Sequence, residues 1–596
     1  MVKIYRYIWE LMTSRERKRF LIVLSIAILS ALFDAIGVAS IFPFLRVLSD
    51  PDILYQNGVF NDFFQQSGIS DPTDFILLLG VGVFALIVLS MAVRALSTYV
   101  QVRFGLMRAY ALSAKLLEGT LTLPYVLLIS RHSAELGQAI LSEVTTVVHK
   151  CILPAILLLA NGATAFAIIM TLIIIEPAIA LSAAGFLISI YVGVYLGLKG
   201  VLGRIGSQRL QANKDQYRIT QEATGGVKEL KLLGLEKVFL ARFQKPAHKL
   251  AQTQTQSLLI SSMPRFALEG MLYGGFILLI MTMSLHSTTG MVDAIPLLGL
   301  IGMAGSRLLP ILQQIYNQAT TLRFSEPGLQ KLCYDFREVN MLACAPLTAP
   351  HLPLASTLQL QNTSFSYPDT KAATFENLSL TIPANTTVGL VGGTGAGKTT
   401  VVDLILGLLE PSAGQVLVDG NPLNRKNIRG WQRNIGYVPQ HIFLSDSSIS
   451  ENIAFGQEKG DIDMAAVERA AKIANLHNFV TEELPEGYDT MVGERGVRLS
   501  GGQRQRIGIA RALYHDPGVL ILDEATSALD NVTERAVMEA VHNIGHAKTI
   551  IMIAHRLSTV EKCDKIFVLE KGELVGEGTY DELVAGNDIF RKMAVG

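Results

Sequence analysis

The stretch 388-VGLVGGTGAGKTT-400 joins a short apolar run to a glycine-rich loop, a lysine and two threonines. Its residues Gly392, Gly397, Lys398 and Thr399 satisfy the spacing GxxxxGK[ST]. Glycines leave the backbone N–H groups of such a loop accessible to phosphates, the lysine balances phosphate charge, and the hydroxyl is a ligand for Mg²⁺. The stretch therefore predicts a strand, a phosphate-binding loop and the first turn of a helix.

Two further segments carry groups that suit phosphate chemistry. The run 518-GVLILDE-524 reads as an apolar strand ending in two acids, where Asp523 can hold the Mg²⁺ shell and Glu524 can polarise an attacking water. Upstream, 499-LSGGQRQRIGIARAL-513 offers a hydroxyl and bare glycine N–H groups at a helix start, which predicts a second anion site. Strand-like and helical patterns alternate from residue 357 onward, which indicates an α/β domain.

The first half of the chain is much more apolar than this domain. A helix that crosses a bilayer needs about 20 mostly apolar residues. Six such runs occur near 20–45, 75–98, 152–175, 178–198, 266–285 and 292–315. We expect an α-helical six-span transmembrane domain fused to an α/β phosphate-loop domain.

The distribution of basic residues predicts the orientation of the spans. The segments 47–73, 176–177 and 286–291 contain no Lys or Arg, whereas 1–19, 99–150 and 199–265 are rich in them. Because basic loops stay on the cytoplasmic side, both termini and the α/β domain are expected in the cytoplasm. Apolar residues recur at three- and four-residue intervals in the two long basic segments, which predicts helices that continue beyond the membrane.

Proline content indicates the domain boundaries, and the charge and cysteine content exclude some kinds of site. The proline-rich run 344-CAPLTAPHLPLAST-357 indicates a linker, so we expect a transmembrane domain over 1–325, a linker over 326–356 and the α/β domain over 357–596. Lys plus Arg equal Asp plus Glu at 51 each, which gives no basic field for nucleic acid. The four cysteines lack CxxC spacing, so neither a disulfide framework nor a zinc site is expected.

Taken in order, these motifs resemble the ATP-binding cassette domain of the ABC transporter superfamily over residues 357–596. The resemblance implies ATP and Mg²⁺ as cofactors. It implies that Gln440 in YVPQ contacts Mg²⁺, that His555 in IAHRLST contacts the γ-phosphate, and that Tyr367 in FSYP stacks on adenine. It also relates SALD at 527–530 to the loop that joins two subunits, and VGERG at 492–496 to a loop that contacts the membrane helices.

The site residues that follow from the motifs and the resemblance fall into three groups. The expected catalytic residues are Glu524, His555 and Gln440, and the expected Mg²⁺ ligands are Thr399, Gln440 and Asp523. The expected ATP contacts are Tyr367, Gly392, Gly393, Thr394, Gly395, Ala396, Gly397, Lys398, Thr399, Thr400, Ser500, Gly501, Gly502 and Gln503.

The six spans with long cytoplasmic extensions resemble the exporter half of this superfamily. The resemblance implies that the signature segment of one domain closes on the phosphate loop of another, so a dimer is required. Because Glu524, His555 and LSGGQ are all intact, two copies of this chain can form two competent sites, and we expect a homodimer. An unequal partner chain stays open as the alternative. The expected location is the bacterial cytoplasmic (inner) membrane.

The cargo is indicated by two segments, 122–144 and 225–243, that resemble bacterial lipid-linked oligosaccharide flippases. The outer segment 48–68 mixes apolar residues with acids and is expected to form a short helix at the membrane surface. Arg265 and Arg307 are candidate substrate residues, because arginine facing lipid is costly. Alternatively Arg265 is a boundary charge and Arg307 pairs with Glu269 or Asp34. No third arginine lies one or two helical turns beyond Arg307, where Gln313 and Gln314 stand.

We therefore expect an ATP-driven exporter or flippase of a lipid-linked oligosaccharide or related amphipathic glycolipid. An exporter of peptides or hydrophobic drugs is the alternative. A third possibility is an ABC ATPase without a transport role, acting on DNA or ribosomes or regulating another membrane protein, and six fused spans argue against its soluble form.

Overall fold

The computed structural model describes residues 1–55, 59–69, 71–129, 133–175, 177–286, 295–341, 349–368, 373–524, 534–540, 547–554 and 556–595. Its internal contacts divide the chain into two compact units, and each is described by itself. Unit 1 comprises 1–121 and 131–342, and unit 2 comprises 122–130 and 343–596.

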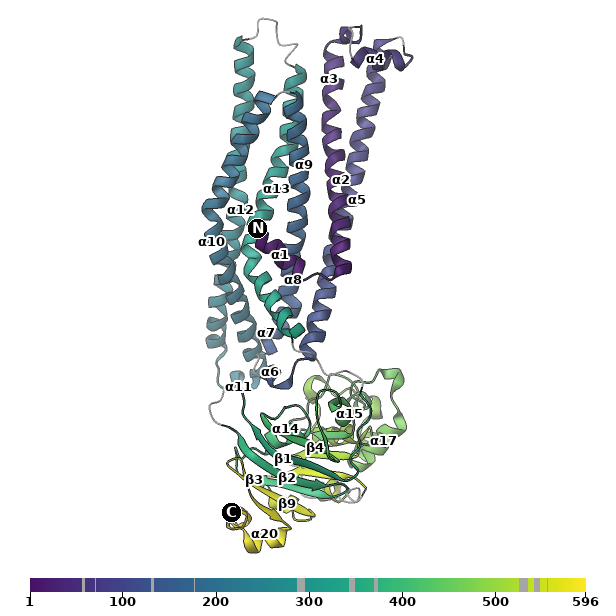
Figure 1. Ribbon diagram of the computed structural model, residues 1–596, viewed down its shortest axis with the longest axis vertical. Helices are drawn as coiled ribbons and strands as arrows, with labels where there is room; N and C mark the ends of the chain where they lie inside the picture. Colours follow the sequence, from purple (N-terminus) through teal and green to yellow (C-terminus); the bar gives the residue numbers. More distant parts are fainter. Residues whose placement is uncertain are drawn as a thin grey trace. The chain divides into compact units, whose positions relative to one another are not determined.

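Unit 1 is helical. Its described elements are α1 Val2–Glu10, α2 Ser14–Ala39, α3 Ile41–Ser49, η1 Pro51–Tyr55, α4 Val59–Gln66, α5 Pro72–Leu121, α7 Ser133–Gly137, η2 Gln138–Glu143, α8 Val144–Val147, η3 Val148–Ile152, α9 Leu153–Ile175, α10 Pro177–Gly225, α11 Val227–Leu232, α12 Glu236–His286 and α13 Ile295–Met341. Helix α2 packs on α5 and α9, whereas α10 packs on α12 and α13, as the long parallel ribbons of Figure 1 show.

Four helical segments among the described residues are long and apolar enough to cross a membrane: Ser14–Gly37, Pro72–Leu121, Glu135–Ile174 and Ile188–Gly225. In Pro72–Leu121 only 6% of the apolar window is buried, so its apolar side chains face outward, as expected of a helix that meets lipid. The runs predicted near 266–285 and 292–315 fall in α12 and α13, in stretches that are only partly described. The count of six spans stays a prediction.

Three segments refine the sequence-based description. The run 20–45 is divided, because α2 ends at Ala39 and α3 begins at Ile41. The outer segment contains a short helix, α4, in agreement with the expectation for 48–68. Helix α13 continues to Met341, so residues 326–341, which we placed in the linker, are helical. Three of their apolar side chains are buried in one cluster with Ile4 and Ile8 of α1: Leu329, Leu332 and Phe336.

Unit 2 contains two sheets. Strands β1 Thr357–Phe365, β2 Phe375–Pro383, β4 Ala413–Val418 and β5 Asn421–Pro422 form an antiparallel sheet in the order β2-β1-β4-β5. The second sheet has the order β10-β9-β3-β8-β7-β6, built from β3 Thr387–Gly392, β6 Ile435–Val438, β7 Val519–Asp523, β8 Thr549–Ile553, β9 Lys565–Glu570 and β10 Glu573–Gly578. Only the β10–β9 pairing in this second sheet is antiparallel.

Helices complete unit 2, and Figure 1 shows several of them around the strands. They are α6 Tyr125–Ile129, α14 Lys398–Ile405, α15 Ile428–Gln432, α16 Ile449–Ile453, α17 Met464–Ile473, α18 Gly501–Leu513, α20 Tyr580–Gly586 and α21 Asp588–Val595, with short turns η5 Lys459–Asp461, η6 Phe479–Glu483, η7 Gly487–Asp489, η8 Glu494–Gly496 and η9 Leu557–Thr559.

The buried centre of the second sheet positions the candidate site. Every residue of β3, β7 and β8 is buried, which explains why these strands are continuous apolar runs in the sequence. Because β3, β6, β7 and β8 are parallel, their carboxyl ends meet at one edge of the sheet. Ligands of parallel α/β sheets bind at this edge.

Candidate nucleotide site

The loop after β3 has a backbone that only glycine adopts easily. Gly392 has φ 155° and Gly397 has φ 97°, both in the region that side chains disfavour. A Cβ atom at Gly392 would lie 2.1 Å from the carbonyl oxygen of Leu569, which is a severe clash. Residues 393–395 and Thr399 are exposed, so the loop and the first turn of α14 present N–H groups and a hydroxyl at the surface. This arrangement suits a phosphate chain.

Lys398 begins α14 and is 6% exposed. Its Nζ donates to the carbonyl oxygens of Gly392 at 2.7 Å and Gly393 at 3.1 Å. Burial lowers the pKa of this ammonium, while the carboxylates of Glu524 and Asp523 act in the opposite direction. The loop thus holds one buried positive charge that phosphate oxygens can neutralise.

The acids predicted at the end of β7 lie beside the glutamine predicted from YVPQ. Asp523 is the last residue of β7 and is 7% exposed. Gln440 follows β6 and donates from Nε2 to Glu524 Oε2 at 2.7 Å. The structure therefore brings together Gln440 and Glu524, which are 84 residues apart in the sequence.

Asp403 is a member of this region that the motifs did not indicate. It lies on α14, and burial, followed by the charge of Asp523, raises the pKa of its carboxyl to about 6. Tyr437 on β6 donates to Asp523 Oδ2 at 3.4 Å, and burial raises the pKa of this phenol. A polar residue between the apolar Val402 and Leu404 of 398-KTTVVDLI-405 was the only sequence signal for Asp403.

Tyr367, the expected adenine partner, lies at the same loop. Its hydroxyl is 3.3 Å from Thr400 Oγ1, and its ring meets that of Phe365 edge-on at 5.0 Å. The structure therefore places Tyr367 beside the start of α14. Stacking on adenine stays a prediction.

The signature segment starts α18 as expected. Ser500 is the N-cap of this helix: its Oγ accepts from Gln503 N–H at 3.2 Å, and Gln503 Oε1 accepts from Ser500 N–H at 2.8 Å. The spacing S-x-x-Q is a capping-box pattern, so these two side chains stabilise the helix start. Gln505 on the same helix donates to the carbonyl oxygen of Glu524 at 3.0 Å, which connects α18 to the residue that we predict to be catalytic.

Some predicted residues lie outside this site or outside the described residues. His555 and the SALD loop at 527–530 are outside the described residues. In unit 1, Arg265 on α12 forms an ion pair with Glu269 at 2.6 Å. Arg307 lies on α13, and its side chain is not described. Among the described side chains, Arg94 lies 3.9 Å from Asp34, the residue that we considered as a partner of Arg307; the Arg307 pairing stays a prediction.

The residues present fit a magnesium nucleotide. Thr399 and Gln440 are exposed oxygen donors, and Asp523 adds a carboxylate at the same edge of the sheet. Mg²⁺ prefers a few such oxygen ligands together with phosphate oxygens and water. Within the described residues no group of three His, Cys, Asp or Glu side chains is placed to hold a metal ion.

Comparison with known proteins relates part of the chain to one family. Residues 375–527 match the family model described as ABC transporter. The chain is 46% identical over 231 residues to the heterocyst differentiation ATP-binding protein HepA of Nostoc, which covers 39% of this chain and 37% of that protein. It is 46% identical over 241 residues to ABC transporter B family member 1 of Arabidopsis thaliana, which covers 40% of this chain and 18% of that protein. These alignments thus span less than two fifths of each relative.

A solved structure extends the likeness of the fold to the whole chain. It is described as a bacterial Atm1-family ABC exporter with ATP bound, with a TM-score of 0.80 and 23% identity, covering 98% of this chain and 99% of that one. Residues 375–527 are therefore similar to the ABC transporter family, and the chain as a whole has the fold of that exporter.

Proposed function

We propose that this protein is an ATP-driven exporter whose cargo is a lipid-linked oligosaccharide or a related amphipathic glycolipid. One observation carries the ATPase part of the proposal. The glycine loop with buried Lys398 lies at the same sheet edge as the hydrogen-bonded pair Gln440–Glu524. A phosphate cradle and a carboxylate that can orient water are the two parts that ATP hydrolysis requires.

Each of these residues has a separate task in the proposed reaction. Lys398 and the loop N–H groups hold the phosphates and neutralise their charge. The Glu524 carboxylate accepts a hydrogen bond from water and orients it toward the γ-phosphate, and His555 is proposed to contact that phosphate. Thr399, Gln440 and Asp523 would hold Mg²⁺, which would neutralise further phosphate charge. Gln440 contacts Glu524 directly, so a movement of the segment that follows β6 changes the position of the carboxylate.

The proposed active form is a homodimer. In each site the phosphate loop of one copy faces Ser500, Gly501, Gly502 and Gln503 of the other. ATP closure of the paired domains then moves the helical domains between inward- and outward-open states. Residues 122–130, which contain α6, group with the ATP-binding unit, and Val126 packs against its core. This packing supports a role for the segment 122–144 in transmitting that movement.

The glycolipid cargo rests on the two segments 122–144 and 225–243 and on the outer helix α4. Arg265 and Arg307 are proposed to guide the anionic phosphates of the carrier, since guanidinium matches paired phosphate oxygens. Because Arg265 is already paired with Glu269, an anion must compete with that carboxylate. The proposed location is the bacterial cytoplasmic membrane, with the ATP-binding domain in the cytoplasm.

The test is reconstitution of the full chain in proteoliposomes with a fluorescent lipid-linked glycan. We expect ATP-dependent translocation by the unmodified protein. Glu524→Gln should reduce hydrolysis by about 10²- to 10⁴-fold, because the amide retains the shape but loses the carboxylate. ATP binding should persist in this variant, measured with a fluorescent nucleotide.

Two results would count against the proposal. Hydrolysis at the unmodified rate in Glu524→Gln contradicts the catalytic assignment. Hydrolysis without glycan translocation contradicts the cargo, and transport of peptides or hydrophobic drugs in the same vesicles would favour the alternative exporter.

A further inference from the structure

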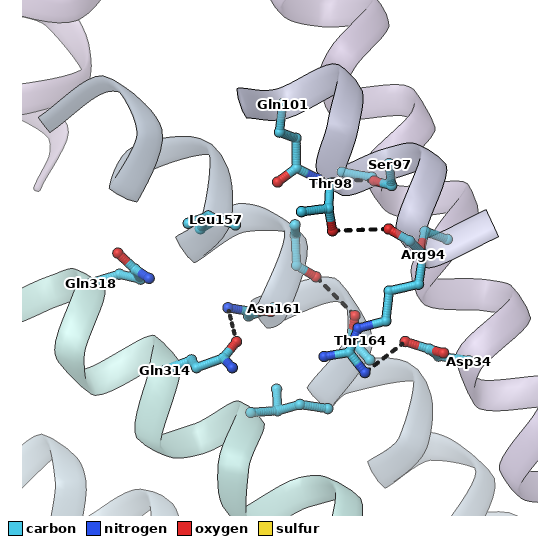
Figure 2. Close-up of a pocket in the computed structure, with 14 residues that line it drawn as sticks. Asp34, Arg94, Ser97, Thr98, Gln101, Leu157, Asn161, Thr164, Gln314 and Gln318 are labelled. Atoms are coloured by element: carbon cyan, nitrogen blue, oxygen red, sulfur yellow. Dashed lines mark hydrogen bonds and ion pairs between the residues drawn. The ribbon is translucent and has the colours of Figure 1, made fainter. Parts of the chain in front are cut away.

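A polar cavity of about 410 Å³ lies inside unit 1, between α2, α5, α9 and α13 (Figure 2). Ten of its fourteen lining residues are polar or charged. Three of these helices belong to segments that are apolar enough to cross a membrane. Polar side chains in such helices are costly and mark a functional site unless they face a bundle interior that pairs them fully.

The sequence places these polar residues on single helix faces. On α5 they are Arg94, Ser97, Thr98 and Gln101, with the spacing i, i+3, i+4 and i+7. This is the repeat of one face of an α-helix. The lining residues of the other three helices follow the same repeat, so four faces converge on one volume.

The cavity contains a loosely associated pair of opposite charges. Asp34 accepts a hydrogen bond from Ser90 Oγ at 2.6 Å, and its side chain is 10% exposed. Arg94 Nη1 lies 3.9 Å from Asp34 Oδ2, which is beyond hydrogen-bond distance, and the Arg94 side chain is 46% exposed. Figure 2 shows Arg94 extending from α5 toward Asp34 past Thr164. The two charges make the site close to neutral overall, and the Arg94 guanidinium is too far from Asp34 to donate an N–H to that carboxylate.

Two amides face each other on the other side of the cavity. Asn161 Nδ2 donates to Gln314 Oε1 at 3.0 Å (Figure 2). Each of these amides has a further donor or acceptor beyond this bond. The neighbouring Gln313 has a different role, because it donates to the Ser261 carbonyl oxygen at 2.9 Å and accepts from Tyr191 Oη at 3.0 Å. Helix α13 thus uses Gln313 for packing and presents Gln314 to the cavity.

We propose that this cavity binds an uncharged, hydroxyl-rich group, that is, a sugar. Sugar hydroxyls both donate and accept, which matches a lining of amides, hydroxyls and one charge pair. A phosphate would bring a second negative charge next to Asp34, which the low-dielectric surroundings make unfavourable. The volume is within the range of small-ligand pockets. The sugar class rests on the proposed function, in which this sugar belongs to the glycan of the cargo.

Binding is measured on the full chain in nanodiscs without nucleotide, so that transport is not needed for the result. The probe is radiolabelled octyl β-D-glucoside below its micellar concentration, with octyl phosphate and octanol as competitors that share its tail. We expect self-competition but little displacement by octyl phosphate. The double variant Asn161→Leu/Gln314→Leu should weaken binding by about tenfold or more, because two amides that line the cavity are lost. The matched control is Thr171→Val on α9, whose hydroxyl bonds to its own helix at Ala167 O.

A second measurement uses the unmodified protein, so it tests the site even if the double variant fails to fold. A glucoside with a photoreactive group on the ring should label peptides of the unmodified protein that contain Asn161 or Gln314. Labelling of other peptides by the glucoside would overturn the proposed sugar site. Equal glucoside binding by the double variant and by Thr171→Val would also overturn it. Stronger binding of octyl phosphate, lost in Arg94→Ala, would instead show an anion site and also overturn it. Sugar binding without glycan translocation would contradict the proposed cargo and leave this site in place.

Discussion

At the scale of single residues, the environment of Asp403 determines a pH-dependent stability. Its pKa of about 6 lies above the ordinary value of 3.8, so the fold disfavours the ionised carboxylate. The penalty is absent well below pH 4, grows as the pH rises, and is complete above pH 6. Asp403 lies on α14 and Asp523 ends β7, and the negative charge of Asp523 contributes to the raised pKa of Asp403.

We predict that Asp403→Asn stabilises the ATP-binding domain at pH 7.5 and stabilises it clearly less near pH 4.5. After allowance for solvent screening the gain is about 1 kcal/mol, or about 2–4 °C in Tm for a domain of this size. The measurement is the apparent Tm of the full chain in detergent between pH 4.5 and 7.5. The exposed Asp446→Asn serves as control. A gain of the same size at both ends of the pH range would show that charge is not its cause.

At the scale of elements, a buried ion pair joins three segments of unit 1. Arg209 Nη2 of α10 lies 2.6 Å from Glu143 Oε1 of η2, and both side chains are 4% exposed. Gly328 of α13 closes over the pair, since a Cβ atom there would lie 2.0 Å from Glu143 Oε1. Gln138 Nε2 donates to the other carboxylate oxygen at 3.3 Å. This junction couples α10, α13 and the helical segment before α9.

Removal of one charge of the Glu143–Arg209 pair should therefore destabilise unit 1 more than removal of both charges. We predict that Glu143→Ala destabilises unit 1 by about 3–5 kcal/mol, because Arg209 is left buried and unpaired. The double variant Glu143→Leu/Arg209→Met should recover most of this loss, since apolar groups of similar size carry no desolvation cost. The measurement is the apparent Tm of the purified single and double variants, compared with that of the unmodified protein. Equal losses for single and double variants would argue that the pair acts only through its shape.

The elements also show what the sequence can predict. The phosphate loop, β7 and the α18 start follow from local patterns, because glycine conformation, strand burial and helix capping depend on neighbouring residues. The pairings Gln440–Glu524, Asp34–Arg94 and Asn161–Gln314 join residues 60 or more positions apart, or on different helices, and local patterns do not encode them. The helix α13 continues past the predicted start of the linker at residue 326, because Leu329 and Phe336 are buried by tertiary packing that the proline-rich run 344–357 does not report.

At the scale of the whole molecule, the proposed homodimer makes a prediction about mixed dimers. If each ATP site combines the phosphate loop of one copy with the signature segment of the other, a defect in either part disables both sites of a uniform dimer. Lys398→Ala removes the buried charge of the loop, and Ser500→Arg places a bulky cation at the start of α18. Each variant alone should show little hydrolysis.

A mixed dimer of these two variants behaves differently under the same model. One of its sites combines both defects, whereas the other combines an unmodified loop with an unmodified signature segment. We predict that co-expressed, differently tagged Lys398→Ala and Ser500→Arg chains, purified through both tags, regain a measurable part of the activity of the unmodified protein. Uniform dimers of each variant are the controls. If every site were formed within one chain, both chains of the mixed dimer would be defective and no activity would return. The recovered fraction therefore measures how far one copy completes the site of the other.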